Sequence, residues 1–295
     1  MSVSKCFYET VSESLSPNMM DFKFTEAIMQ TNYHTHTPHC GHAAGESTAD
    51  YAKAAFSLGL KVLGFSDHAA FPDTDFGYRM SFEEMNVYFD EVDELRKEYA
   101  PQGMEIYKGL EIEYLPEYLD CKLIPGGNYY EYLLNEKKLD YLLCGEHFFR
   151  TREGNLLNLY NIDSSELVID YALACKEAME TGYFKVLAHP DLFGVNDFPW
   201  DDNIDKASDI IIETAIKTGS ILEFNANGYR RGIKHYTDCD RLMYPLENFW
   251  KKIPGTGIQI IIGSDSHNMT EIIDYAIDKA EEKLAELGIT PIDRL

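Results

Sequence analysis

The sequence predicts a parallel α/β domain in which short buried strands alternate with helices. Two observations favour this class. Seven short segments are largely apolar, as strands covered on both faces of a parallel sheet should be. Helical patterns lie between most of these segments, and this alternation is typical of parallel α/β chains. With 295 residues the chain is long enough for one large barrel-type domain or two smaller domains.

The seven strands are predicted at these apolar runs, and the five clearest helices each have a boundary signal. In chain order the predicted strands span 30–34, 61–66, 104–111, 140–144, 184–188, 220–225 and 258–263. The helix 81–99 opens with the capping box Ser81-x-x-Glu84. A glycine, the usual residue beyond a helix C-terminus, directly follows the predicted helices 48–58, 166–181, 205–218 and 271–287.

No linker, low-complexity tract or repeat separates these elements, so residues 30–295 are predicted to form a single domain. Residues 1–29 are then an N-terminal extension without an assigned role. Residues 1–31 contain no apolar run longer than three residues, far short of a signal-peptide core or a membrane span. A cytoplasmic protein without a membrane partner is therefore expected.

The charge and the cysteines exclude other classes. The chain has 50 acidic and 26 basic side chains, a net charge of −24, and no basic run, so nucleic acid is not an expected partner. The six cysteines show no CxxC spacing, which argues against a disulfide framework or a zinc ribbon and favours reduced, mostly buried thiols. The sequence does not indicate an oligomeric state.

Seven of the nine histidines and two acids fall at or just beyond the C-terminal ends of six predicted strands. In a closed β/α barrel this is the face where active sites are built. Histidines without a shared role should also occur inside helices, so a metal cluster explains the pattern economically. The nine candidate ligands are His34, His36, His42, His68, Glu111, His147, His189, Asp265 and His267.

The local spacings support this interpretation, although each piece alone could be a core histidine with an ordinary partner. Residues two apart in an extended segment point the same way, so His34-Thr35-His36 and Asp265-Ser266-His267 can each direct two ligands into one pocket. Imidazole with carboxylate suits zinc, iron or manganese rather than magnesium or calcium. His39 is a weaker candidate in the ligand-rich loop, and His235 is expected at the surface or facing substrate.

Together these motifs resemble the PHP (polymerase and histidinol phosphatase) superfamily. The similarity rests on His34-Thr35-His36, Ser66-Asp67-His68, Gly109-Leu110-Glu111, His189-Pro190-Asp191 and Ser264-Asp265-Ser266-His267, with His42 and His147 between them. It spans residues 32–268. The resemblance implies a distorted seven-stranded β/α barrel with a trinuclear metal site, and hence two to three divalent ions of Zn, Fe or Mn.

By motif position, the resemblance implies how the ligands are shared among three metals. His34, His36, Glu111 and Asp265 would hold the first, and Glu111, His147 and His189 the second. His42, His68 and His267 would hold the third. Glu111 would then bridge two metals.

The segment 223–230, followed by Tyr244-Pro245, is similar to the substrate-side motif of the histidinol-phosphatase branch. It includes the substrate-binding candidates Asn225 and Arg230, and Arg230 is the candidate for gripping a phosphate oxygen because its fork supplies paired donors. The alternative is that this segment is a strand followed by an ordinary loop with no role in substrate binding. Glu146 departs from the branch pattern, because many members carry a Gly-Ser-aliphatic run before this histidine.

The resemblance implies a metal-dependent phosphomonoesterase that converts L-histidinol phosphate to L-histidinol and phosphate, a step of histidine biosynthesis. Asp67 and Asp191 are candidates for the acid that protonates the leaving alkoxide. One alternative is a related phosphoesterase that acts on phosphotyrosine or nucleotides. Another is a metal-binding domain without catalysis, which the complete ligand set disfavours.

Overall fold

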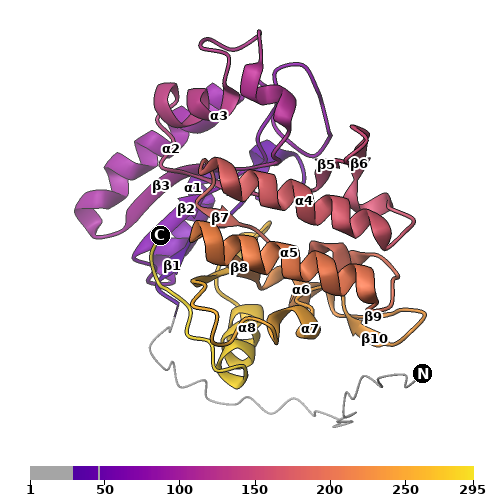
Figure 1. The fold of residues 1–295 in the computed structure, drawn as a ribbon. Coiled ribbons are helices and arrows are strands. Elements are labelled where there is room, and N and C mark those ends of the chain that lie inside the picture. The colour runs from indigo at the N-terminus through magenta and orange to yellow at the C-terminus, as the bar shows by residue number, and fades with distance from the viewer. Residues whose placement is uncertain (1–28, 46) are drawn as a thin grey trace, which may run out of the picture.

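The computed structural model describes residues 29–45 and 47–295, and its centre is a parallel seven-stranded sheet curled into a nearly closed barrel (Figure 1). The order of the strands is β1-β2-β3-β4-β7-β8-β11. They are β1 (Thr31–Asn32), β2 (Val62–Phe65), β3 (Glu105–Ile112), β4 (Tyr141–Cys144), β7 (Val186–Leu187), β8 (Ile221–Asn225) and β11 (Ile260–Gly263). The predicted fold class and all seven predicted barrel strands are therefore confirmed.

The barrel closes where the segments after its first and last strands meet. Thr35 forms a parallel bridge with Ser266. The amide of His36 donates to the carbonyl of Ser266 (2.9 Å), and the amide of Ser266 donates to the carbonyl of His34 (3.3 Å). This closure brings the histidine pair after β1 next to the Asp-x-His motif after β11.

Inside the barrel, Tyr141 occupies space that two glycines leave free. Its hydroxyl lies 2.7 Å from the carbonyl oxygen of Tyr33 and 3.0 Å from that of Phe65. A Cβ on Gly64 would lie 2.4 Å from the Tyr141 hydroxyl, and one on Gly109 would lie 2.5 Å from its ring. The interior is thus a packed core below the site, as in other β/α barrels.

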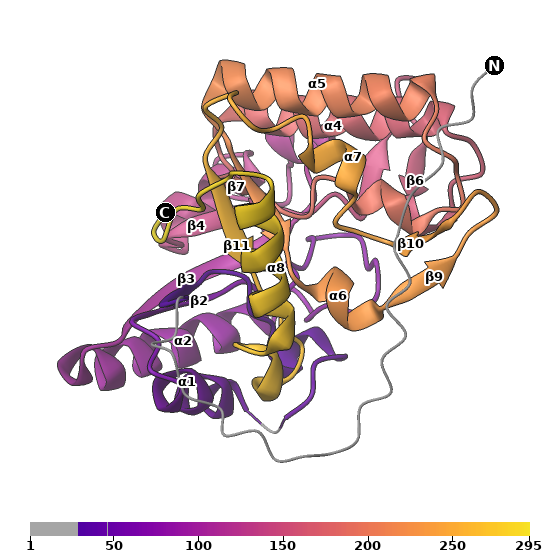
Figure 2. The same ribbon diagram turned by 90° about the horizontal axis from the view of Figure 1, so that it is seen from below.

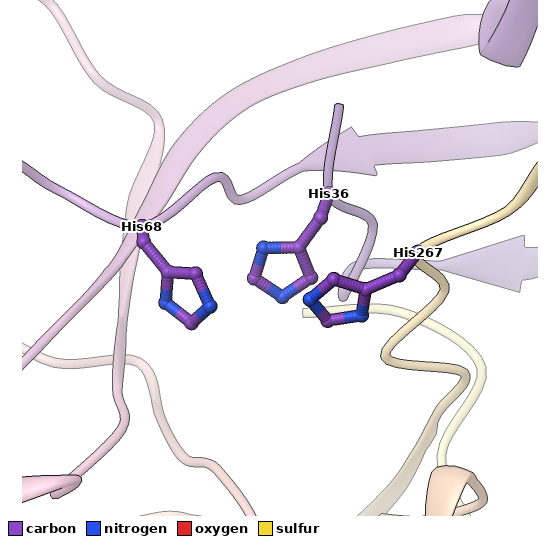
Figure 3. A group of neighbouring side chains, drawn as sticks. All are labelled: His36, His68 and His267. Atoms are coloured by element: carbon purple, nitrogen blue, oxygen red, sulfur yellow. The ribbon is translucent and has the colours of Figure 1, made fainter. Parts of the chain in front are cut away.

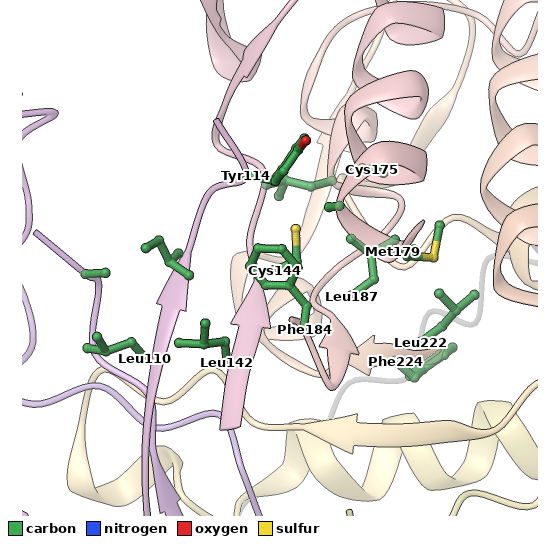
Figure 4. Close-up of a cluster of buried hydrophobic side chains, with 14 of the residues drawn as sticks. Leu110, Tyr114, Leu142, Cys144, Cys175, Met179, Phe184, Leu187, Leu222 and Phe224 are labelled. Atoms are coloured by element: carbon green, nitrogen blue, oxygen red, sulfur yellow. The ribbon is translucent and has the colours of Figure 1, made fainter. Parts of the chain in front are cut away.

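Helices cover the outside of the barrel. In both views α4 and α5 run side by side along one side, whereas α1 and α2 pack together at the other (Figure 2). Outward-facing Leu142, Leu187 and Leu222 contribute to the buried cluster beside Cys175 and Met179 of α4 (Figure 4). The helices are α1 (Thr48–Ser57), α2 (Met85–Tyr99), α3 (Tyr129–Glu131), α4 (Glu166–Thr181), α5 (Asp202–Thr218), α6 (Asn227–Arg231), α7 (Glu247–Trp250) and α8 (Tyr275–Glu286).

Helix starts differ from the prediction for local reasons. Ser81 and Glu84 form the reciprocal capping bonds (2.9 and 3.3 Å), yet the α-helix begins only at Met85 because turns fill the interval. Asp201 caps α5 and starts it three residues earlier than predicted. Asp274 caps α8, which starts four residues later than predicted because a 3-10 turn, η7 (Met269–Glu271), precedes it.

Two small hairpins were not predicted. One pairs β5 (Phe148–Arg150) with β6 (Leu156–Asn158), and the other pairs β9 (Ile233–His235) with β10 (Asp240–Leu242). Each strand has only three residues, and β9 is fully exposed, so neither apolar alternation nor burial marks it in the sequence. Both hairpins lie outside the barrel sheet.

The predicted extension 1–29 lies outside the described residues except for Met29, which is buried in the core. The division into an extension and one barrel domain therefore stays a prediction. Four cysteines of the described part, Cys40, Cys121, Cys144 and Cys175, are buried free thiols, whereas Cys6 lies outside that part. Within that part, no helix is both long and apolar enough to cross a membrane.

Candidate metal centre

The nine predicted ligands converge at the C-terminal end of the barrel. The ring of His36 is central: ring centroids lie 4.1 Å away at His267, 4.3 Å at His68 and 5.1 Å at His34. Figure 3 shows that the imidazoles of His36, His68 and His267 gather at one point although they follow three different strands. The other imidazoles extend the cluster on two sides. The ring centroid of His42 lies 4.5 Å from that of His267, and the ring centroids of His147 and His189 lie 5.0 Å apart.

Glu111, near the end of β3, is the carboxylate at the centre of this cluster and is 1% exposed. Its two oxygens face different imidazoles. A Cβ on Gly145 would lie 2.1 Å from Oε1, so the glycine leaves room for the carboxylate. Oε2 lies 3.3 Å from His34, 3.4 Å from His36 and 3.1 Å from His68, whereas Oε1 lies 2.7 Å from His189 and 3.6 Å from His147.

Asp265 supplies the second carboxylate. Its Oδ1 lies 3.3 Å from His36 Nε2, and its Oδ2 accepts hydrogen bonds from the side-chain amides of Asn225 (3.3 Å) and Asn227 (3.1 Å). The backbone φ angles of Asp265 (48°) and His189 (30°) fall in the left-handed region that favours glycine. Strain of this kind persists where the surroundings enforce a functional geometry.

The cluster shifts the pKa values of its members in opposite directions. Burial alone would raise the pKa of Glu111, but His34, His147 and His68 hold it well below its ordinary range. Burial alone would lower the pKa of His36, but Asp265 and Asp67 raise it to about 9. For His68, burial and the nearby His36 lower the pKa to about 3. In the metal-free cluster Glu111 is therefore ionised and His68 is neutral, whereas His36 carries a proton that a metal ion has to displace.

Further carboxylates hold the ligand rings from behind. Glu223 Oε1 lies 2.6 Å from His34 Nδ1, and Glu113 Oε1 lies 3.4 Å from His147 Nδ1. A Cβ on Gly263 would lie 1.7 Å from Glu223, so glycine again makes space. Partners of this kind fix the tautomer and orientation of a metal-ligating histidine.

The residues fit a group of divalent metals. Three buried ring nitrogens have no hydrogen-bond partner: His36 Nδ1, His189 Nδ1 and His267 Nε2. Several triplets of donor atoms lie within 4.8 Å of one another, and this mix of imidazole and carboxylate suits Zn, Fe or Mn. The triplets include His34-His36-Glu111, His34-His189-Asp265, His36-His68-His267 and Cys40-His42-His267.

A cavity of about 610 Å³ opens above the cluster. Its wall contains residues that were not singled out in the sequence: Arg79, Arg231, Glu271 and Tyr160. The guanidinium of Arg231 lies 5.7 Å from the ring centroid of Tyr244, which also lines the cavity. Arg231 could have been found as the neighbour of the predicted Arg230, whereas no sequence signal marks Arg79.

The two substrate-binding candidates, Arg230 and Asn225, do not line the cavity. Arg230 is not in the cavity wall; it donates to Asp274 (2.9 Å, twice) and to the carbonyls of Ser264 (2.6 Å) and Glu271 (2.7 Å), so it holds the start of α8. Asn225 is 1% exposed and is occupied with Glu223 and Asp265.

Neither acid candidate lines the cavity. Asp67 is fully buried and accepts hydrogen bonds from the amide of Thr37 (3.1 and 3.2 Å), with Oδ1 3.5 Å from His36 Nδ1. Asp191 accepts from the amide of Leu246 (2.5 Å) and the indole of Trp250 (2.9 Å), and burial raises its pKa to about 6. Both carboxylates hold neighbouring segments in place.

The remaining residues of interest turn away from the site. His39 pairs with Glu91 at 2.9 Å, and His235 is 86% exposed and pairs with Asp240. Glu146, the departure from the branch pattern, is fully buried, accepts from the amide of Tyr114 (2.9 Å) and is absent from the cavity wall. Burial raises its pKa well above the ordinary range.

Buried histidines and carboxylates at the C-terminal face of a parallel barrel are an arrangement that suits a metal-dependent hydrolytic enzyme. The PHP domain family model matches residues 32–227, so the chain belongs to the PHP domain family. A "probable histidinol-phosphatase" from Deinococcus radiodurans is 28% identical over 271 residues, covering 86% of this chain and 92% of that protein.

Two solved structures share the fold. One is the histidinol phosphate phosphatase of Lactococcus lactis in complex with zinc, L-histidinol and phosphate, with a TM-score of 0.64 and 16% identity over 89% of this chain and 95% of that one. The other is a provisionally named histidinol phosphatase of Listeria monocytogenes, with a TM-score of 0.63 and 19% identity over 82% of this chain and 97% of that one. The family and the curated relative together make the chain a metal-dependent phosphatase.

Proposed function

We propose that the chain hydrolyses L-histidinol phosphate to L-histidinol and phosphate, using two to three divalent ions of Zn, Fe or Mn. The observation that carries the proposal is the cavity above the cluster, where ligands, an arginine and a separate carboxylate face one space. The relative named a histidinol-phosphatase supports the choice of substrate. Free, mostly buried thiols fit the proposed cytoplasmic location.

In this proposal the metals are held by the nine residues expected from the sequence. Glu111 would serve as a ligand to two ions, since its two oxygens face different imidazoles. His42, at the mouth of the cavity, completes the set together with His68 and His267. When bound, divalent cations supply an activated water and neutralise charge on the phosphoryl oxygens.

The chain's own residues orient the substrate. Arg231 presents donors to a phosphate oxygen from the cavity wall, in the role first expected of Arg230. Glu223 and Glu113 keep the Nδ1 atoms of His34 and His147 engaged, which leaves Nε2 of each ring directed at the cluster. No carboxylate other than the proposed ligands and Glu271 lines the cavity within the described residues.

Glu271 supports a substrate that carries a positive group. One of its carboxylate oxygens accepts from the amide of His267 at 3.0 Å, and its backbone carbonyl accepts from Arg230 at 2.7 Å, so its position is fixed. A carboxylate beside a phosphate site repels the phosphate, but it pairs with the ammonium group of L-histidinol phosphate. Phe76 and Phe148, which also line the cavity and have ring centroids 4.6 Å apart, provide an apolar surface for an imidazole.

A phosphate-release assay on the purified enzyme tests the proposal. L-histidinol phosphate, a phosphotyrosyl peptide, nucleoside monophosphates and p-nitrophenyl phosphate are compared by kcat/KM after supplementation with Zn, Fe or Mn. L-histidinol phosphate is expected to exceed every other ester. A faster phosphotyrosyl peptide or nucleotide would replace the substrate and keep the metal chemistry, and no phosphate release from any ester would favour a metal-binding domain without catalysis.

A further inference from the structure

Arg79 and Glu113 form a buried two-point ion pair under the wall of the cavity. Nη1 lies 3.0 Å from Oε2 and Nη2 lies 3.0 Å from Oε1, with side chains that are 5% and 1% exposed. Nη1 also donates to the carbonyl of Ala69 at 3.0 Å. Parallel bonds of this type fix the plane of the carboxylate as well as its distance.

The carboxylate held in this way faces one of the proposed metal ligands. Glu113 follows Glu111 by two residues, and its Oε1 lies 3.4 Å from Nδ1 of His147. The other ring nitrogen of His147 lies 3.6 Å from Oε1 of Glu111. Arg79, Glu113, His147 and Glu111 therefore form a continuous chain of polar contacts that ends in the cluster.

The same arginine holds the cavity wall. Arg79 belongs to the segment between β2 and α2, in which Phe76, Gly77 and Tyr78 line the cavity beside it. Its guanidinium lies 5.0 Å from the ring centroid of Phe76, and Phe76 packs on Phe148, the residue after His147. One side chain thus contacts both the wall and the support of a ligand.

We infer that Arg79 is a positioning residue, which orients His147 toward the metals through Glu113 and fixes the wall segment 76–79 over the substrate. Without the guanidinium, Glu113 would be a buried carboxylate paired only with His147, and because such a poorly compensated charge is strongly unfavourable, the carboxylate would no longer be held in its present orientation. The ligand would then lose its preset orientation. This inference rests on the proposed role of His147 as a metal ligand, and it does not depend on which ester is hydrolysed.

The test compares Arg79→Met and Arg79→Lys with the wild-type holoenzyme, using metal content as the main readout. Lysine keeps the charge but supplies a single point of contact, so it leaves the plane of Glu113 free. Metal equivalents after dialysis and the rate of metal loss to a chelator are measured at equal fold content by circular dichroism. Arg150→Met is the matched control, because it breaks the exposed Arg150–Glu117 pair.

Arg79→Met is expected to release one metal equivalent about 10 to 100 times faster than the wild type, with the other equivalents retained. The rate of metal release from Arg79→Lys is expected to lie between those of Arg79→Met and the wild type, and the rate from Arg150→Met is expected to match the wild type. His147→Ala marks the result of losing the ligand itself, and Arg79→Met in that background should add little. Wild-type metal release in a folded Arg79→Met or Arg79→Lys variant would overturn the inference.

The two proposals fail separately. If the wild-type enzyme binds its metals but prefers another phosphate ester, the substrate proposal is replaced while the metal-release comparison still decides the role of Arg79. If both Arg79 variants keep normal metal release but lose activity on every ester equally, Arg79 acts on the wall alone and the inference is wrong. A rise in KM together with faster metal release supports both halves of the role.

Discussion

The single carboxylate of Glu111 contacts histidines in both parts of the cluster. We expect Glu111→Gln to lower kcat/KM at least about 100-fold and to reduce the metal content, because an amide is a poorer ligand and cannot supply two anionic oxygens. Metal analysis and kinetics on the same sample check this. The glutamine is nearly isosteric, so circular dichroism should match the wild type, and a folded variant with normal turnover would exclude the bridging role.

The proposed phosphate contact can be tested beside its neighbour. Arg231→Ala is expected to lower kcat/KM on L-histidinol phosphate about 10- to 1000-fold, because a charge-assisted bond to an oxyanion is worth about 1.5 to 3 kcal/mol or somewhat more. Its metal content should not change. Kinetics within about twofold of wild type would show that Arg231, although it lines the cavity, does not contact the phosphate.

Glu271 gives a test of substrate class at one residue. Glu271→Gln keeps an oxygen for the amide of His267 but removes the charge. We expect kcat/KM on L-histidinol phosphate to fall about tenfold, since a contact worth about 1.4 kcal/mol is lost, while p-nitrophenyl phosphate, which has no ammonium group, changes less than about twofold. An equal loss on both esters would assign Glu271 to the support of His267 instead.

The candidate ligands were easier to predict from the sequence than the residues that hold them in place. The nine ligand candidates are visible because histidines recur after separate strands. Arg230 and Arg231 are adjacent and chemically identical, and only the packing against Asp274 decides which one is occupied. Asp67 and Asp191 stand beside ligands in the sequence, yet their carboxylates face Thr37 and Trp250, because the chain turns directly after each strand.

At the scale of elements, α8 depends on Arg230. The guanidinium joins Asp274, the N-cap of the helix, to the carbonyls of Ser264 and Glu271, and its side chain is 9% exposed. Arg230→Ala should lower the free energy of unfolding by about 3 kcal/mol, as expected when one partner of a buried pair is removed. Thermal denaturation measures this, with Lys217→Ala at an exposed pair as the control, and an unchanged Tm would contradict it.

The elements themselves were predicted to the extent that burial marks them. The barrel strands are apolar because helices cover one face and the barrel core the other, and the helices carry caps or terminal glycines. The two hairpins lack both signals. The local sequence pattern also could not predict whether the sheet closes into a barrel, because closure depends on the contact between Thr35 and Ser266, which are 231 positions apart.

At the scale of the whole molecule, closure makes the site. His34 and His36 come from the start of the barrel, and Asp265 and His267 come from its end. The sheet has to close before these residues form one cluster, so metal binding and completion of the fold are coupled. The same coupling predicts how the stability of the whole protein responds to pH and metal.

Protons and metals compete for this cluster. In the metal-free protein, burial alone would lower the pKa of His36, but Asp265 and Asp67 raise it to about 9 from an ordinary 6.5, and the pKa of His34 is raised as well. The stability from these charged pairs is fully present below about pH 6.5 and is lost as the pH rises through about 9. Metals require the deprotonated rings, so their affinity should increase over the same interval, by up to about tenfold per pH unit for each proton displaced.

We therefore expect the difference in Tm between metal-loaded and chelator-treated protein to widen from about pH 6.5 to 9, because binding tightens while the metal-free state weakens. Differential scanning calorimetry of both forms across this range measures the difference, and a constant or shrinking gap would show that the imidazoles are not protonated when the metals are absent.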